Sequence, residues 1–216
     1  LQFTLAVLLD RAGDVEAAAA ASERCLEGAE ALGYRLGEMN GASTAGMLLY
    51  RRGRLAAAMA PIERAIQLSV ELGHVATERN ARLIAAVTLA DLGRPAEARF
   101  HVERAMALAR AAGEARGEAQ VRLRMVHIHG VQNDLDAAFD QARAALDAFE
   151  SLGDAGHAAI ARAELGRNAR RRGDAGTARA ALDAAVTELE AHGERTHWLV
   201  ARLDRARLAR AGRGAA

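Results

Sequence analysis

Three carboxamide side chains recur at a fixed interval and could bind the backbone of another polypeptide. Asn40, Asn80 and Gln120 are 40 residues apart, and each lies near the start of an expected helix. A carboxamide both donates and accepts hydrogen bonds, so a ladder of them can hold an extended peptide without reading its side chains. The series stops at Ile160 and Val200, so the ladder would cover only the N-terminal half. The alternative is that these are ordinary surface residues near helix starts.

Other side chains on the same expected helix face change from mixed and apolar to basic along the chain. An arginine-lined end could pair with acidic side chains or with a C-terminal carboxylate, whereas the alternative is a solvated charged face. The candidate binding residues of this face, besides the three carboxamides, are Met47, Tyr50, Arg51, Val87, Arg124, His127, Arg167, Arg170 and Arg171. Flanking positions on it are Ser43, Leu83, Leu123, Arg207 and Arg210.

Patterns for catalysis, cofactors and metals are missing from the sequence. There is no phosphate-binding loop, dinucleotide fingerprint or HExxH helix, and one cysteine, Cys25, cannot form a paired zinc motif. His127 and His129 are two residues apart on an expected helix, so they point to different faces and make a poor metal pair. His129 shares its repeat position with leucines, which favours a buried histidine bonded to a neighbour. We therefore expect no enzymatic activity, no cofactor and no metal.

A repeat of 40 residues positions all of these side chains. Two series of residues recur at this interval and suit helix ends, where a positive φ closes the helix and glycine, or else asparagine, is favoured. The first series is Gly33, Gly73, Gly113, Gly153 and Gly193, and the second is Gly13, Gly53, Gly93, Asn133 and Gly173. Two alanine series predict close helix packing: Ala18, Ala58, Ala98, Ala138 and Ala178, and then Cys25, Ala65, Ala105, Ala145 and Ala185.

Short connections make consecutive helices antiparallel neighbours, so the sequence predicts an all-α, right-handed superhelical solenoid with a concave inner face. The expected helices are 1–12, 14–32, 35–52, 55–72, 75–92, 95–112, 115–132, 134–152, 155–172, 175–192 and 195–211. They form five hairpins and one further helix in a single domain, 1–216. Its repeats are approximately 1–33, 34–73, 74–113, 114–153 and 154–193, with a partial or capping unit at 194–216.

One repeat carries a recognisable pattern: Leu165-Gly166 in its first helix, then Ala178, Leu182 and Ala185 in its second. This unit resembles a tetratricopeptide repeat (TPR). It departs from that family where Arg162 replaces a tryptophan and Ala169 a tyrosine, and its period of 40 exceeds the usual length of about 34. Such long repeats are similar to those of bacterial LuxR-type ATP-binding activators and Streptomyces antibiotic regulators. The resemblance implies an inner groove lined by the first helices.

Composition limits the classes of partner. The formal net charge of +1 argues for neither nucleic acid nor membrane, and no apolar run reaches membrane-spanning length. Aromatic residues make up only 3% of the chain, so the basic part has few stacking side chains. No signal peptide is visible and the sequence begins at Leu1 without Met, so we expect a cytoplasmic piece of a longer bacterial protein.

Three local features complete the expectations. Pro61 falls inside a second helix and should bend it or shift its start. Glu38, Glu78 and Glu118 share one repeat position, which we interpret as stabilisation of helix starts by the helix dipole. The last helix keeps the apolar residues Leu199, Leu203 and Leu208, so it either caps the stack or docks on another body.

The sequence thus favours a protein- or peptide-binding scaffold, the interaction or sensing arm of a larger signalling or transcription regulator. Two alternatives stay open. One is a small-molecule effector domain with a pocket of Met47, Tyr50, Arg124 and His127. The other is a self-assembly arm that forms homo-oligomers through its end helices.

Overall fold

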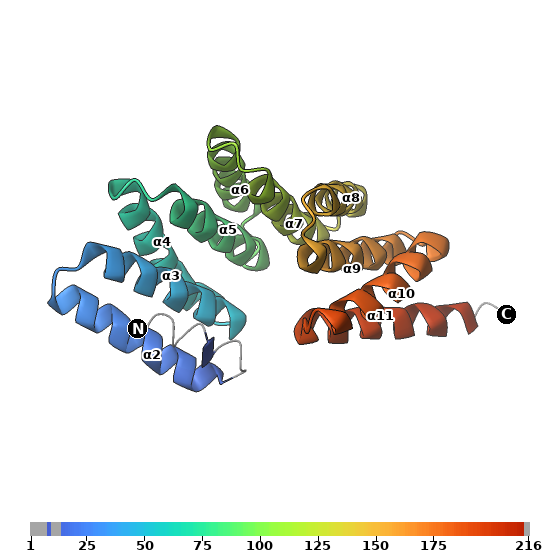
Figure 1. Ribbon diagram of the computed structural model, residues 1–216, viewed down its shortest axis with the longest axis horizontal. Helices are drawn as coiled ribbons and strands as arrows, with labels where there is room; N and C mark the ends of the chain where they lie inside the picture. The colour runs from blue at the N-terminus through green and yellow to red at the C-terminus, as the bar shows by residue number, and fades with distance from the viewer. Residues whose placement is uncertain (1–7, 10–13, 214–216) are drawn as a thin grey trace. The chain divides into compact units, whose positions relative to one another are not determined.

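The computed structural model describes residues 8–9 and 14–213, and this part of the chain consists of ten α-helices with no strand (Figure 1). The helices are α2 (Val15–Ala31), α3 (Arg35–Arg51), α4 (Leu55–Glu71), α5 (Val75–Asp91), α6 (Pro95–Ala111), α7 (Ala115–Val131), α8 (Leu135–Ser151), α9 (Ala155–Arg171), α10 (Ala175–Ala191) and α11 (Arg195–Arg213). The helix expected at 1–12 lies outside the described residues except for Leu8 and Leu9.

The helix ends fall where the repeat predicts them. Every glycine of the two helix-end series that the structure describes has a positive φ, and Asn133 takes the same conformation with φ 59°. At Gly53, the amide of Gly53 donates to the carbonyl of Tyr50 and the amide of Arg54 to that of Leu49. These bonds satisfy carbonyls that the last helical turn leaves open. The period of 40 is therefore set by local backbone chemistry.

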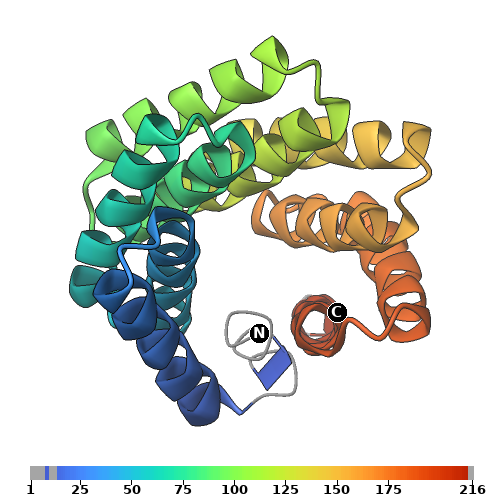
Figure 2. The same cartoon turned by 60° about the vertical axis from the view of Figure 1, so that its left-hand side comes forward.

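The chain forms two compact units, residues 1–112 and 113–216, which we call unit 1 and unit 2. In unit 1, α2 packs on α3, α3 on α4, α4 on α5 and α5 on α6, and α3 also contacts α5. In unit 2 the helices from α7 to α11 pack in the same sequential way, with further contacts of α9 with α7 and α11. Figure 2 shows the hairpins of each unit from a second side. The fold is an all-α solenoid of antiparallel helical hairpins.

The cores of both units depend on small residues where two helices approach closely. In both alanine series, the members from position 58 onward are fully buried. Gly46 and Gly166 lie at the same repeat position, and a Cβ on either would come within 2.5 Å of Ile62 Cγ1 or 2.8 Å of Leu182 Cγ. Glycine therefore lets a bulky residue of the second helix pack directly against the first helix.

The two prolines of the chain both lie in second helices but at different places in them. Helix α4 runs through Pro61 and starts in register with the other second helices, so Pro61 does not shift the helix start. Pro95 opens α6, where its missing N–H has no helical acceptor to lose. None of the described helices combines the length and apolar character that crossing a membrane would need.

Candidate functional site

In unit 1 the candidate side chains occupy one stripe of α3 and the neighbouring helix α5. Asn40 is half-buried near the start of α3, and Asn80 is exposed at the equivalent position of α5. Because α3 and α5 contact each other, the two carboxamides belong to adjacent first helices of the same unit. Asn40 and Asn80 thus place the same hydrogen-bond donor and acceptor groups on two adjacent first helices of this unit.

The remaining candidates of unit 1 differ in accessibility. Met47 and Tyr50 are half-buried and Arg51 is exposed on α3. Val87 on α5 is only 5% exposed, so its side chain belongs to the core and offers a ligand little surface. Leu83, one turn earlier on α5, is equally buried. On α5, the accessible part of the face therefore consists of the exposed Asn80 and the half-buried Ile84, not of Leu83 or Val87.

In unit 2, α7 carries the half-buried Gln120 and the exposed Arg124 and His127. These three side chains follow one another at intervals of about one helical turn, so they lie along one face of α7. Among the residues that the structure describes, no three or more His, Cys, Asp or Glu side chains gather as metal ligands would. His129 is half-buried, with Nδ1 3.5 Å from Asp134 Oδ2.

The arginines of α9 have an acceptor that the sequence analysis did not identify. Asp204 of α11 is only 2% exposed and lies between them. Arg167 Nε donates to Asp204 Oδ2 at 2.8 Å, and an Arg170 terminal nitrogen donates to Oδ1 at 3.0 Å. Arg207 reaches the same carboxylate at 3.6 Å. One buried acid thus collects three basic side chains from two helices.

Further hydrogen bonds hold the arginines in place. Arg167 also donates to both oxygens of Glu164, at 2.8 and 2.9 Å. Burial acts to lower the pKa of Arg167, but Glu164 and Asp204 outweigh it and the pKa lies above its ordinary value. Arg171 donates to the carbonyl of Gly130 at 3.0 Å, near the end of α7. Two acids against four arginines leave this cluster with an excess of positive charge.

The signal that could have revealed Asp204 is present in the sequence. It is the one acidic residue between Arg195 and Arg210, and it lies three residues before Arg207 and one repeat after Glu164. A single acid among arginines on a packed helix predicts an internal counter-ion, because an unpaired buried carboxylate is costly. Its partners on α9, 34 and 37 residues earlier, follow only from the packing of α9 against α11.

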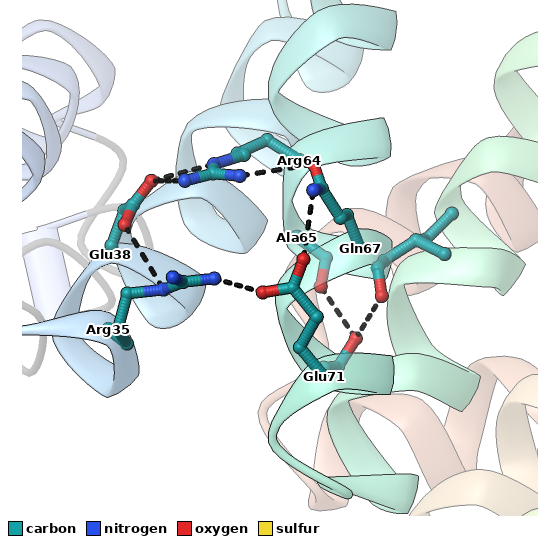
Figure 3. A network of polar contacts seen from close by, with 8 residues as sticks. Arg35, Glu38, Arg64, Ala65, Gln67 and Glu71 are labelled. Carbon is teal, nitrogen blue, oxygen red and sulfur yellow. Dashed lines mark hydrogen bonds and ion pairs between the residues drawn. The ribbon is translucent and has the colours of Figure 1, made fainter.

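Glu38 and Glu78, two members of the glutamate series, form ion pairs between helices and within one helix. Figure 3 shows Glu38 between Arg35 and Arg64, with Arg64 Nε donating to Glu38 Oε1 at 2.7 Å. Arg35 also pairs with Glu71 at the end of α4, and Gln67 joins both Arg64 and Glu71. This network ties the start of α3 to the last turns of α4, so Glu38 does more than stabilise a helix start.

Glu78, the next member of the series, accepts from Arg82 on its own helix at 2.7 Å. Both side chains are about one tenth exposed, so the pair is shielded from water. In unit 2, Arg162 stands at the position where the TPR pattern has tryptophan, and it bridges Glu150 of α8 and Glu188 of α10. Arginines therefore link neighbouring helices in both units.

A shallow cavity of about 330 Å³ lies beside Arg162 in unit 2. Its lining comprises Phe149, Glu150, Gly153, Ala155, Ala158, Arg162, Glu188 and His192. No candidate of the expected binding face is among them. The alternative small-molecule pocket of the sequence analysis comprises residues of both units. Met47 and Tyr50 belong to unit 1, and Arg124 and His127 belong to unit 2.

Comparison with known proteins supports the fold. No family model and no curated protein matches the sequence. A Rap protein crystallised with the competence and sporulation factor has a similar structure, with a TM-score of 0.85 and 16% identity over 94% of this chain. The chain spans 57% of that protein.

Two further solved structures are similar over most of both chains. BtubC from P. vanneervenii has a TM-score of 0.66 at 16% identity, covering 93% of this chain and 92% of its own. YrrB, described as a TPR protein with an unusual peptide-binding site, has a TM-score of 0.51 at 19% identity, with coverage of 95% and 90%. The fold is thus TPR-like, as the repeat pattern predicted.

Proposed function

We propose that this chain is a non-catalytic scaffold that binds an extended peptide or protein segment along its first helices. The observation that carries the proposal is the pair of accessible carboxamides, Asn40 and Asn80, one repeat apart on the contacting helices α3 and α5. Each can exchange a donor and an acceptor with a peptide group, so successive repeats can engage successive stretches of the ligand backbone.

Side chains next to the carboxamides would add contact area and charge. In unit 1, Met47 and Tyr50 are half-buried beside the exposed Arg51, a combination of apolar surface and a polar rim. In unit 2, the excess positive charge around Asp204 and the exposed Arg124 suits acidic side chains or a terminal carboxylate of the ligand.

The similar structures are consistent with this proposal. The Rap protein was crystallised with a competence and sporulation factor, and YrrB is described as having a peptide-binding site. We propose further that the scaffold is the sensing or interaction arm of a larger bacterial, cytoplasmic regulatory protein. A bound segment would change how neighbouring hairpins pack, and such changes cost little because each repeat contacts only its neighbours.

The test uses a random peptide library displayed on phage, selected against the intact chain. Selected peptides are then synthesised and their affinities measured for the chain and for a variant with Asn40→Ala, Asn80→Ala and Gln120→Ala. We expect binding to weaken at least about tenfold, because three donor–acceptor groups are lost. The midpoint of thermal unfolding should be nearly unchanged, since the three side chains are exposed or half-buried.

A matched control replaces two carboxamides away from this face, Gln67→Ala and Gln132→Ala, and should keep full affinity. Gln67 belongs to the network in Figure 3 and Gln132 follows α7. Equal loss of affinity in both variants, or parallel loss of affinity and thermal stability, would show that the carboxamides do not form a binding site.

A further inference from the structure

Helix α11 exposes a face that includes two positions, those of Leu199 and Ala206, whose equivalents are buried in the earlier first helices. We define the α11 face by Leu199, Arg202, Leu203 and Ala206, which are spaced by three and four residues and so lie together. Leu199 and Leu203 are 60% and 50% exposed. The repeat positions matching Leu199 are buried in every earlier first helix, at Met39, Arg79, Ala119 and Ala159. An exposed leucine at a core position, with the exposed Leu203 one turn further on, indicates a surface that another chain covers.

The preceding hairpins show what covers the position of Ala206. A bulky residue of the second helix packs on a glycine of the first helix at Gly46 and Gly166. Across four repeats, a small residue on one helix matches a large one on the other, and both are buried. The pairs are Gly46 with Ile62, Ala86 with Val102, Val126 with Ala142, and Gly166 with Leu182. Helix α11 has alanine at this position, as α5 has at Ala86, whose partner is Val102. The same pairing of small with large residues therefore requires a residue of about valine size on the helix that covers α11.

Charge distinguishes the two helix types in unit 2. The second helix α8 carries four acidic residues and one arginine. The second helix α10 carries three acidic residues and one arginine. The first helix α9 carries four arginines and one glutamate. An ion pair joins them where Arg162 Nε donates to Glu188 Oε2 at 3.0 Å. Arg202 is the repeat equivalent of Arg162, and its guanidinium lies 4.6 Å from the ring centroid of Trp198.

We propose that the α11 face binds an acidic amphipathic α-helix of another polypeptide in the position of a second helix. The bound helix would place a valine-sized residue on Ala206 and cover Leu199. Six residues after its valine-sized residue, the bound helix would present a carboxylate to Arg202. This spacing is that of Leu182 and Glu188 in α10. A second copy of α11 does not fit, since it would bring its five arginines from Arg195 to Arg210, both included, against an equal set.

This partner site is independent of the proposed peptide ladder. Arg202, Leu199 and Ala206 are not among the candidate residues of the ladder, and the two carboxamides that carry it lie in unit 1. The α11 face therefore predicts a helical ligand, whereas the ladder predicts an extended one.

The experiment measures binding of a fluorescent synthetic peptide to the intact chain by anisotropy. The peptide has the sequence of residues 174–192 with Leu182→Val, and it retains Asp174 as the helix N-cap. We expect saturable binding that is at least about tenfold weaker for the Leu199→Asp chain. The unmodified peptide, with leucine facing Ala206, should bind more weakly than the valine peptide.

A charge exchange separates specific docking from general attraction of an acidic peptide to a basic helix. Glu188→Arg in the peptide, or Arg202→Glu in the chain, should each weaken binding, and the two changes together should restore it. Arg205→Glu serves as the matched control of equal charge, and it should not restore binding of the Glu188→Arg peptide. Leu199 and Arg202 are exposed, so these variants should keep the circular-dichroism melting curve of the parent chain.

Three results would overturn the proposal. One is the absence of saturable binding up to about 1 mM peptide. Another is undiminished binding to the Leu199→Asp chain, as expected if the peptide displaced α10 instead. The third is a dimer of the chain in sedimentation equilibrium that Leu199→Asp dissociates, because a second copy would then cover the face.

Discussion

The two units contain the same repeat but stabilise its helices through different polar interactions. In unit 1, the residues that precede α3, α4, α5 and α6 are Tyr34, Arg54, His74 and Arg94, and none caps its helix through a side-chain bond. In unit 2, Asp134, Asp154 and Asp174 each accept a hydrogen bond from the backbone amide three residues later. Aspartate therefore satisfies helix-start donors at three helices of unit 2, but in unit 1 only at α2, where Asp14 accepts from the amide of Ala17. Glu114 before α7 makes no such bond.

The ion pairs that join helices also differ, although unit 1 has a shielded pair of its own within α5, Glu78 and Arg82. Unit 1 joins α3 to α4 through the network of Glu38 and Arg64 at its surface, where Arg64 is 40% exposed. Unit 2 buries the carboxylate of Asp204, which is 3% exposed at the side chain, beneath two partly covered arginines. The repeat therefore requires the helix ends and small core residues, while capping and charge pairing vary between units. We expect unit 2 to resist local unfolding more than unit 1 does.

The largest expected effect tests what the units share. Leu182→Ala should reduce the free energy of unfolding by about 2–5 kcal/mol, because a fully buried side chain leaves a cavity. Gly166→Val should reduce it by about 1–3 kcal/mol through overpacking against Leu182. The double variant recreates the valine–alanine pair of α7 and α8, so its loss should be about 1–3 kcal/mol smaller than the sum. Urea unfolding of the four proteins measures the cycle.

The matched cycle in unit 1 uses Gly46→Val and Ile62→Ala. The double variant should again lose less unfolding free energy than the sum of the two single variants, as in unit 2. The reason is that a Cβ on Gly46 would lie 2.5 Å from Ile62 Cγ1. Strictly additive losses in both units would show that the small and large residues are not paired.

A smaller effect tests the buried charge of unit 2. Asp204→Asn should cost about 1–3 kcal/mol of unfolding free energy, because Arg167 and Arg170 lose a charged acceptor in a partly dry site. The control is Asp183→Asn, which removes a carboxylate 55% exposed and 3.6 Å from Arg205. Exposed pairs contribute less than about 1 kcal/mol. Equal losses in the two variants would contradict the special role of Asp204.

The smallest effect concerns the caps and depends on pH. Asp154 accepts from the amide of His157 at 3.3 Å and from Arg116 Nε at 2.8 Å. Burial acts to raise the pKa of Asp154, but the bonds from Arg116 and His157 outweigh it and hold the pKa below its ordinary value. A lowered pKa contributes stability above the unfolded-state value of about 3.9, and this stability is lost as the pH falls through the folded-state pKa.

Asp154→Ala should therefore cost about 1 kcal/mol at pH 7 and progressively less below about pH 4. Thermal unfolding at several pH values measures this difference. The converse change in unit 1, His74→Asp, supplies the missing cap of α5 and should stabilise the chain by about 0.5–1 kcal/mol at neutral pH. A pH-independent cost of Asp154→Ala would assign its effect to packing rather than to charge.

Much of the fold was predictable because its determinants are local. Gly53 and Asn133 end helices through backbone conformations that these residue types favour, so their spacing in the sequence gives the helix boundaries directly. The TPR-like class followed from the same spacing and from the buried alanines, and the solved structures confirm it. The candidate binding residues stay a prediction. The structure assigns Val87 to the core because neighbouring helices cover it, which helical periodicity alone does not show.

By itself, the sequence determined the 40-residue repeat, the ends of its helices and the columns of small residues. These depend on backbone angles and side-chain size at positions that neighbours along the chain define. Only the tertiary structure decided which charges meet, as when Asp204 collects Arg167 and Arg170, and which apolar positions stay uncovered, as at Leu199. Electrostatic pairing and burial depend on helices brought together from distant parts of the chain, and each arginine has several acids at similar distances in sequence.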